Sequence, residues 1–341
     1  LPARKQLAQD LLRLGEVDEG WQLVNEVHEQ DGYDVVAFNL VTLRDRMAEF
    51  TTLRDDDFIV RMAADEATIY GDRVMALLHR AKTALCEKYD LALDGPVTVE
   101  IFPDQRDFAI RTFGLPGGAG YLGVCFGNVV TANSPAAMGP TPSNWEAVLW
   151  HEFCHVVTLN VTRNKMPRWL SEGISVYEEK QANGTWGQTM TPQYRKLVVD
   201  GEATPISQLS AAFLRPKSGL HLSFAYYQSS LVVEYVIAEF GLDKMKAVLR
   251  DLGRGVYINQ AIENHMGPID AIDADFDAFL RKRAEQLAPD AKWEDEAFTR
   301  DIQRDPDALK QWVEEHPNHY PGLRVYANVL LSQERYDEAL P

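Results

Sequence analysis

The pentapeptide His-Glu-Phe-Cys-His at residues 151–155 limits what this chain can fold into more than any other segment. Its two histidines are four residues apart, and side chains at that spacing share one face when the backbone is α-helical. The residues between and after them are mainly apolar, which suits a helix in a protein interior. Asn144 is a suitable cap for a helix that runs from Trp145 to about Asn160. We therefore expect a buried helix that presents two imidazoles on one face.

The same pentapeptide predicts a metal site. His151 and His155 would supply two imidazole ligands, and Glu152 beside them could take a proton from metal-bound water. A catalytic zinc ion has three protein ligands and one open position. Glu172 is the polar residue of an otherwise apolar helical stretch, and Gly173 would let that helix approach the first one closely. We therefore expect one Zn²⁺ ion, with Glu152 as the general base. The expected ligands are His151, His155 and Glu172.

Other interpretations of these residues stay open. A helix can carry two histidines on one face by chance, and Glu172 could be a surface glutamate of an amphipathic helix. A structural zinc site is a weaker alternative, because such sites favour four cysteine or histidine ligands. Cys154, next to a predicted ligand, is expected to be a core residue rather than a fourth ligand.

The metal-site residues resemble a known family. The pentapeptide, followed by Pro-Arg-Trp-Leu-Ser-Glu-Gly at residues 167–173, is similar to the pattern of the peptidase MA-like gluzincin family. The resemblance covers about residues 60–250, includes the segment 226–231 and is strongest at 145–180. It implies a thermolysin-type catalytic core, and an edge strand upstream of the metal-binding helix that pairs with extended peptide. Residues 124–132 are the candidate for that strand, and a plain core hairpin is the alternative.

The resemblance also implies a second donor that holds the oxyanion. Tyr226 is the first choice, with Tyr227 and His221 as the next candidates, while a packed core tyrosine is the alternative role for Tyr226. One position departs from the family pattern: Val176 stands where thermolysin-type sites often place a carboxylate that orients a ligand histidine. The candidates for this orienting contact are Glu178, Glu179 and Asn160.

Strand patterns come before most helical patterns along the chain. Residues 96–103 alternate between apolar and polar side chains and are rich in β-branched residues, which predicts a strand. Two further short strands are expected around Gly127 within 124–132. The order predicts an α+β fold: a zincin-like, thermolysin-type catalytic domain with a small upstream β-sheet and a helical lower part. Helices are expected at about 62–89, 168–180, 191–199, 224–240, 243–252 and 271–287.

The two ends of the chain resemble each other. Residues 12–21 and 331–340 each place an apolar helix before a polar turn, followed by Asp-Glu, a small residue and a large one. This pattern resembles a tetratricopeptide repeat, which often flanks members of the peptidase family; unrelated helical hairpins are the alternative. Burial of a solenoid face takes about three stacked units, so further repeats are expected beyond this sequence. The expected domains are a helical tetratricopeptide-like segment at 1–55, a gluzincin peptidase-like domain at 56–288 and a second such helical segment at 289–341.

Charge and composition narrow the expected partners. The formal net charge of −17 argues against nucleic acid, because phosphate binding needs clustered Lys and Arg. The sequence has no apolar run long enough to span a bilayer. The expected partners are a peptide or protein substrate and a protein partner that binds the repeats.

The function that these residues predict is zinc-dependent hydrolysis of peptide bonds, through a zinc-bound water activated by Glu152. An endopeptidase is favoured, because no acidic motif for a free amino group is evident. The alternative is a catalytically weak or inactive zincin-like domain that acts with its repeats as a protein-interaction scaffold. The intact Glu152 argues against that alternative.

Overall fold

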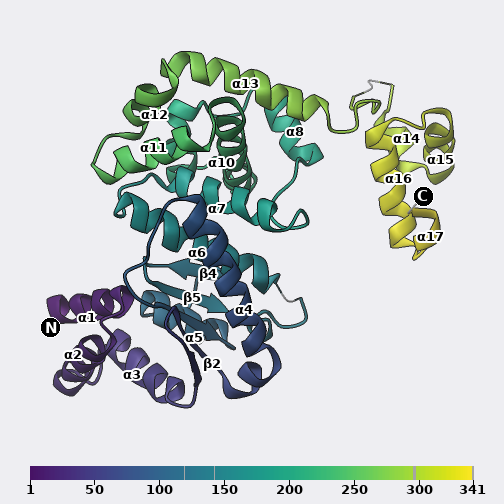
Figure 1. Cartoon of the computed structure of the whole chain (residues 1–341). Coiled ribbons are helices and arrows are strands. Elements are labelled where there is room, and N and C mark those ends of the chain that lie inside the picture. Colours follow the sequence, from purple (N-terminus) through teal and green to yellow (C-terminus); the bar gives the residue numbers. More distant parts are fainter. Residues whose placement is uncertain (119, 142, 295–296, 340–341) are drawn as a thin grey trace. The chain divides into compact units, whose positions relative to one another are not determined.

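The computed structural model describes residues 1–118, 120–141, 143–294 and 297–339 (Figure 1). The fold is mostly helical with one small mixed sheet, which agrees with the predicted α+β class. Contacts divide the chain into two compact units, one made of Leu1–Thr189 and Glu202–Leu280, the other of Met190–Gly201 and Arg281–Pro341. In the described part of the chain, no helix combines the length and the apolar character that a bilayer crossing requires.

The elements of the first unit alternate irregularly between helix and strand. They are α1 (Pro2–Leu14), α2 (Val17–Gln30), α3 (Val35–Met47), β1 (Thr51–Arg54), β2 (Phe58–Met62), α4 (Ala64–Lys88), β3 (Val97–Phe102), α5 (Gln105–Phe113), β4 (Gly123–Cys125), β5 (Val129–Asn133), the 3₁₀ helix η1 (Ala136–Met138), α6 (Trp145–Thr162), α7 (Arg168–Ala182), the 3₁₀ helix η2 (Ile206–Gln208), α9 (Leu209–Leu214), α10 (Gly219–Phe240), α11 (Leu242–Gly253), α12 (Ile258–Met266) and most of α13 (Ile269–Glu285).

The second unit is helical. It contains α8 (Pro192–Val199), the end of α13, α14 (Arg300–Arg304), α15 (Pro306–Glu315), α16 (Tyr320–Ser332) and α17 (Tyr336–Ala339). Within it, the Arg195 guanidinium of α8 lies 4.1 Å from the centre of the Trp293 ring, a cation–π contact. Leu340, which the predicted repeat at 331–340 includes, lies outside the described residues.

The five strands form one sheet in the order β1-β2-β3-β5-β4. The inner pairs β2–β3 and β3–β5 are parallel, whereas β1 and β4 run antiparallel to their neighbours at the two edges. The predicted strand at 96–103 is confirmed as β3, and the two short strands predicted within 124–132 are confirmed as β4 and β5. Among the described strands β4 pairs with β5 alone and forms one edge of the sheet, so its other side has no strand partner.

The long apolar helix predicted around the histidine pair is α6. Its N-cap is Asn144, whose side chain accepts a hydrogen bond from the Ala147 amide, as the sequence predicts. The Phe153 ring of α6 packs against the Phe58 ring of β2, with ring centres 5.9 Å apart. The sheet therefore supports the buried face of α6 and leaves its opposite face for the histidines.

Helix α7 is fixed between two neighbours. At Gly173 an added Cβ would lie 2.6 Å from the Ser229 carbonyl oxygen of α10, so the two backbones approach too closely for any larger residue. The expectation that Gly173 serves contact with α6 is therefore wrong; the close approach is to α10. On another side, the buried Glu178 carboxylate pairs with Lys88 at 2.7 Å and accepts a hydrogen bond from the Tyr89 hydroxyl at 2.6 Å.

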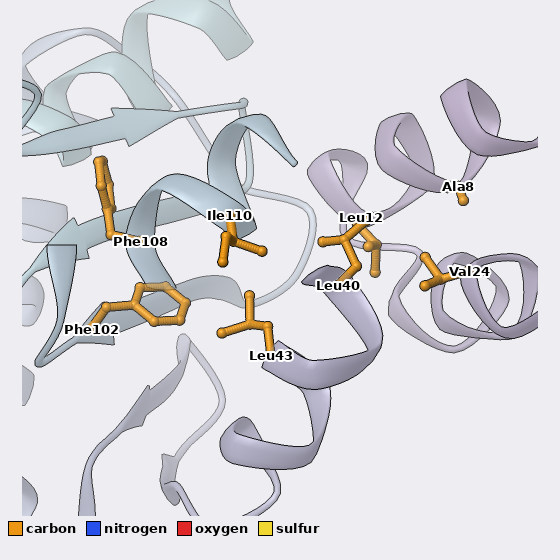
Figure 2. Packing of buried hydrophobic residues seen from close by; sticks show 8 residues of the cluster. All are labelled: Ala8, Leu12, Val24, Leu40, Leu43, Phe102, Phe108 and Ile110. Carbon is orange, nitrogen blue, oxygen red and sulfur yellow. The ribbon is translucent and has the colours of Figure 1, made fainter. Parts of the chain in front are cut away.

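The first three helices share a core with the sheet. Figure 2 shows side chains of α1, α2 and α3 meeting those of β3 and α5 in one apolar cluster. The members of the cluster are Ala8, Leu12, Val24, Leu40, Leu43, Phe102, Phe108 and Ile110. Helices α1 and α2 are also close to each other, since a Cβ at Gly20 would lie 2.8 Å from Leu12.

A buried ion pair joins the sheet to this helical region. The Arg111 guanidinium lies 2.7 Å from the Glu100 carboxylate, and both side chains are only 1% exposed. Arg111 also donates a hydrogen bond to the Leu12 carbonyl of α1 at 2.9 Å. One arginine on α5 therefore connects β3 with the first helix.

We expect Arg111→Met to lower the free energy of unfolding by about 3 kcal/mol, because the buried Glu100 would keep only its longer contact with Arg61, at 3.4 Å. Chemical denaturation measures the loss, and adding Glu100→Leu should recover part of it. The control is Arg73→Met, which removes an exposed ion pair with Glu146 and should cost less than about 1 kcal/mol. Equal losses for the two arginines would contradict the role assigned to Arg111.

Candidate metal centre

The two helices α6 and α7 bring the predicted ligands together. One donor atom from each of His151, His155 and Glu172 lies within 4.8 Å of the other two. Among the described residues, no other group of three or more His, Cys, Asp or Glu side chains comes together in this way. The two imidazole rings are nearly perpendicular, with centres 4.7 Å apart. The helical spacing therefore places both rings beside one carboxylate.

The distances between these atoms suit a metal ion. The Glu172 Oε2 atom lies 3.3 Å from His151 Nε2 and 3.5 Å from His155 Nε2. Ligands about 2.1 Å from a tetrahedral zinc ion are about 3.4 Å from one another. The three donors are nitrogen and oxygen atoms, which is the set that a catalytic zinc site uses. The residues present therefore fit a zinc ion.

The outer nitrogens of both rings are already engaged. His151 Nδ1 lies 2.6 Å from Glu179 Oε1, and His155 Nδ1 lies 2.9 Å from the Ser171 hydroxyl and 3.2 Å from that of Ser175. Such contacts hold a ring in place and leave Nε2 for the metal. All three partners are on α7, so one helix orients both histidines.

Among the candidates for the orienting contact, only Glu179 lies at a ligand histidine. Glu178 points toward Lys88 and Tyr89 instead, and Asn160 donates to Asn128 and to its own helix. The two serines were not among the predicted site residues. Ser171 and Ser175 lie four residues apart with Glu172 between them, and this spacing was the available signal, since it places both serines on one face of α7.

The charges of the site are strongly coupled. Burial opposes ionisation of Glu172, but its hydrogen bonds with His151 and His155 outweigh burial and lower the pKa of this carboxyl. Burial also disfavours a charged His151, yet Glu172 and Glu179 raise the pKa of its imidazole. A proton on His151 therefore competes with a metal ion, and metal affinity should rise with pH.

The predicted base, Glu152, lies beneath the edge strand. Its side chain is 6% exposed, and burial raises the pKa of its carboxyl. An added Cβ at Gly123 of β4 would lie 2.6 Å from Glu152 Cγ and 2.7 Å from its Oε1. The strand therefore passes so close to the carboxylate that a larger residue at position 123 would displace the Glu152 side chain.

Of the three candidate oxyanion donors, Tyr226 is placed at the site. Its hydroxyl accepts a hydrogen bond from Arg168 at 2.7 Å and lies 3.4 Å from Glu172 Oε1. Burial raises the pKa of Tyr226 to about 12, so its hydroxyl keeps its proton at neutral pH. Tyr227 is buried, and His221 is bonded to the Ser218 hydroxyl and to Glu202.

A cavity of about 1110 Å³ opens over the metal-site residues. Its walls come from β4, α6, α7, α10 and the segment 185–188, and they include Glu152, Arg168 and Tyr226. A small-molecule pocket is typically about 300–1,000 Å³, so this cavity has room for several residues of an extended peptide. Cys154 is fully buried, as expected for a core residue.

A family model described as the Peptidase MA superfamily matches residues 82–282, a span that includes α6, α7 and α10. A comparison with curated proteins finds no match to the chain.

We expect Glu179→Gln to weaken zinc binding by about 10- to 100-fold, because His151 would lose the carboxylate that orients its ring. Chelator competition with the purified protein measures the affinity. The neighbouring variant Glu178→Gln should instead lower the melting temperature and leave zinc affinity within about threefold, because Glu178 contacts Lys88 and Tyr89. The assignment of these two glutamates would be wrong if both variants bound zinc equally well.

Proposed function

The chain belongs to the Peptidase MA superfamily, whose model matches more than half of its 341 residues, and on that premise we propose that it is a zinc-dependent metallopeptidase. The observation that carries the proposal is the convergence of His151, His155 and Glu172 beside the buried Glu152 carboxylate, at the floor of a cavity. This arrangement supports a thermolysin-type centre.

In this proposal His151, His155 and Glu172 hold the zinc ion. Bound there, zinc supplies Lewis-acid chemistry, which lowers the pKa of water and polarises a peptide carbonyl. The contacts of Glu179, Ser171 and Ser175 keep the two imidazoles facing the ion.

Glu152 and Tyr226 then carry out the remaining steps. Glu152 takes a proton from a water molecule in the cavity, and its raised pKa makes it a stronger base than an ordinary carboxylate. The resulting hydroxide adds to the peptide carbonyl carbon, the C–N bond then breaks, and Glu152 passes its proton to the nitrogen of the leaving amine. The Tyr226 hydroxyl donates a hydrogen bond to the carbonyl oxygen as negative charge develops on it.

The open side of β4 is the proposed substrate-binding edge. An extended peptide could pair with the backbone there, directly above Glu152. Because a peptide bound in this way needs no free terminus, we propose an endopeptidase. The alternative of an inactive scaffold has no support from the described residues, since the proposed base, ligands and cavity are all present.

The flanking helices are proposed as tetratricopeptide-like segments with a protein partner. The close approach of α1 to α2 at Gly20 supports this for the first segment, because such repeats use a small residue at that contact. The boundaries predicted at 1–55, 56–288 and 289–341 stay predictions.

We expect the wild-type chain, loaded with zinc, to cleave peptides that are blocked at both ends, and chelation to abolish this activity. Glu152→Gln should lower kcat by at least about 1,000-fold with zinc affinity unchanged, because an amide cannot take the proton. Mass spectrometry of a peptide library detects the products. Equal activity of the two proteins would reject the mechanism.

We also expect Gly123→Ala to lower kcat by about 10- to 100-fold, because the added methyl group would displace the Glu152 carboxylate. Zinc affinity should stay within about threefold. The matched control is Gly184→Ala, where a Cβ meets nothing within 4 Å and activity should be preserved. Full activity of Gly123→Ala would show that the edge strand does not position the base.

A further inference from the structure

Arg168 connects the proposed third ligand with the proposed oxyanion donor. It is the first residue of α7, its side chain is half exposed, and it lines the cavity. Its Nε atom donates to Glu172 Oε1 at 3.2 Å, and its Nη2 atom donates to the Tyr226 hydroxyl at 2.7 Å. Two nitrogens of one planar group therefore hold two different parts of the site.

The contact with Glu172 distinguishes the two oxygens of that carboxylate. Oε2 faces the imidazole nitrogens, whereas Oε1 faces away and takes the hydrogen bond from Arg168. With Oε1 fixed, the carboxylate cannot rotate freely, and Oε2 stays directed at the metal position. This contact does for Glu172 what Glu179 does for His151.

The contact with Tyr226 determines where the phenol hydrogen can point. A guanidinium has only donors, so the Tyr226 oxygen must be the acceptor in this pair. The phenol hydrogen must then find another acceptor. In the structure that acceptor is Glu172 Oε1 at 3.4 Å, a long contact that a substrate oxygen in the cavity could replace.

Phe213 contacts both members of this pair. Its ring centre lies 5.7 Å from the Arg168 guanidinium and 5.0 Å from the centre of the Tyr226 ring. The arginine and the tyrosine therefore share one aromatic neighbour, which limits the positions that both side chains can take.

We propose that Arg168 is a positioning residue, which fixes Glu172 toward the metal and directs the Tyr226 hydroxyl toward the substrate carbonyl. This role rests on the proposed peptidase function. It depends on the shape of the side chain as well as its charge, because a lysine ammonium cannot span both partners with a planar fork.

The test compares Arg168→Met, Arg168→Lys, Tyr226→Phe and the double variant Arg168→Met/Tyr226→Phe with the wild-type chain. Zinc affinity is measured by chelator competition, and kcat and KM for a blocked peptide are measured at saturating zinc. Arg163→Met is the matched control, because Arg163 is an exposed arginine in the loop before α7.

We expect both Arg168 variants to lose about tenfold in zinc affinity and at least tenfold in kcat, with KM within about threefold. Tyr226→Phe should lose about 100-fold in kcat and keep its zinc affinity. If Arg168 acts on the reaction through Tyr226, the double variant should have the same kcat as Tyr226→Phe. Arg163→Met should match the wild type in every measurement.

A kcat within threefold of wild type for Arg168→Met, with unchanged zinc affinity, would overturn the positioning role and leave the peptidase proposal standing. Losses of kcat that multiply in the double variant would overturn the part of the role that acts through Tyr226. Full kcat in Arg168→Lys would overturn the requirement for a planar fork. A zinc-loaded wild-type chain that cleaves no peptide would overturn the peptidase proposal itself, and the positioning role with it.

Discussion

The packing of α7 against α6 is the constraint on which the candidate site depends. It places one Glu172 oxygen between the two imidazoles of α6, at spacings that match the edges of a tetrahedron. The three donor atoms come from two helices, so neither helix alone could form the metal site. Gly173 allows the backbones of α7 and α10 to pack closely, and Glu178 forms an ion pair with Lys88 at the end of α4. The contacts of α7 with α10 and α4 therefore help to set the position of the Glu172 ligand.

Most of the polar contacts at the site come from this one helix. Helix α7 supplies Glu172, the contacts to the outer nitrogens of both histidines, and Arg168 at its first position. The proposed base Glu152 and the proposed hydrogen-bond donor Tyr226 come from α6 and α10 instead. The residues that orient the ligands and the residues proposed to act on the substrate therefore lie on different helices.

The local features of the site and the meeting of Glu172 with the two histidines were predictable, whereas the partners of the closely packed glycines were not. The spacing of His151 and His155, the Asn144 cap and the strands β3 to β5 follow from short-range patterns of side-chain periodicity and capping. By contrast, Gly173 was assigned to the wrong helix, and the fit of Gly123 over Glu152 was missed. A glycine signals a close approach, but its partner depends on tertiary packing that a single sequence does not reveal.

The shortness of the sheet edges has a consequence for self-association. β4 has three residues and β1 at the opposite edge has four, so each offers very few backbone groups to another chain. Short edges of this kind protect a protein from edge-to-edge aggregation. A guest strand on β4 would likewise gain few main-chain hydrogen bonds, so discrimination among guests must come mainly from their side chains.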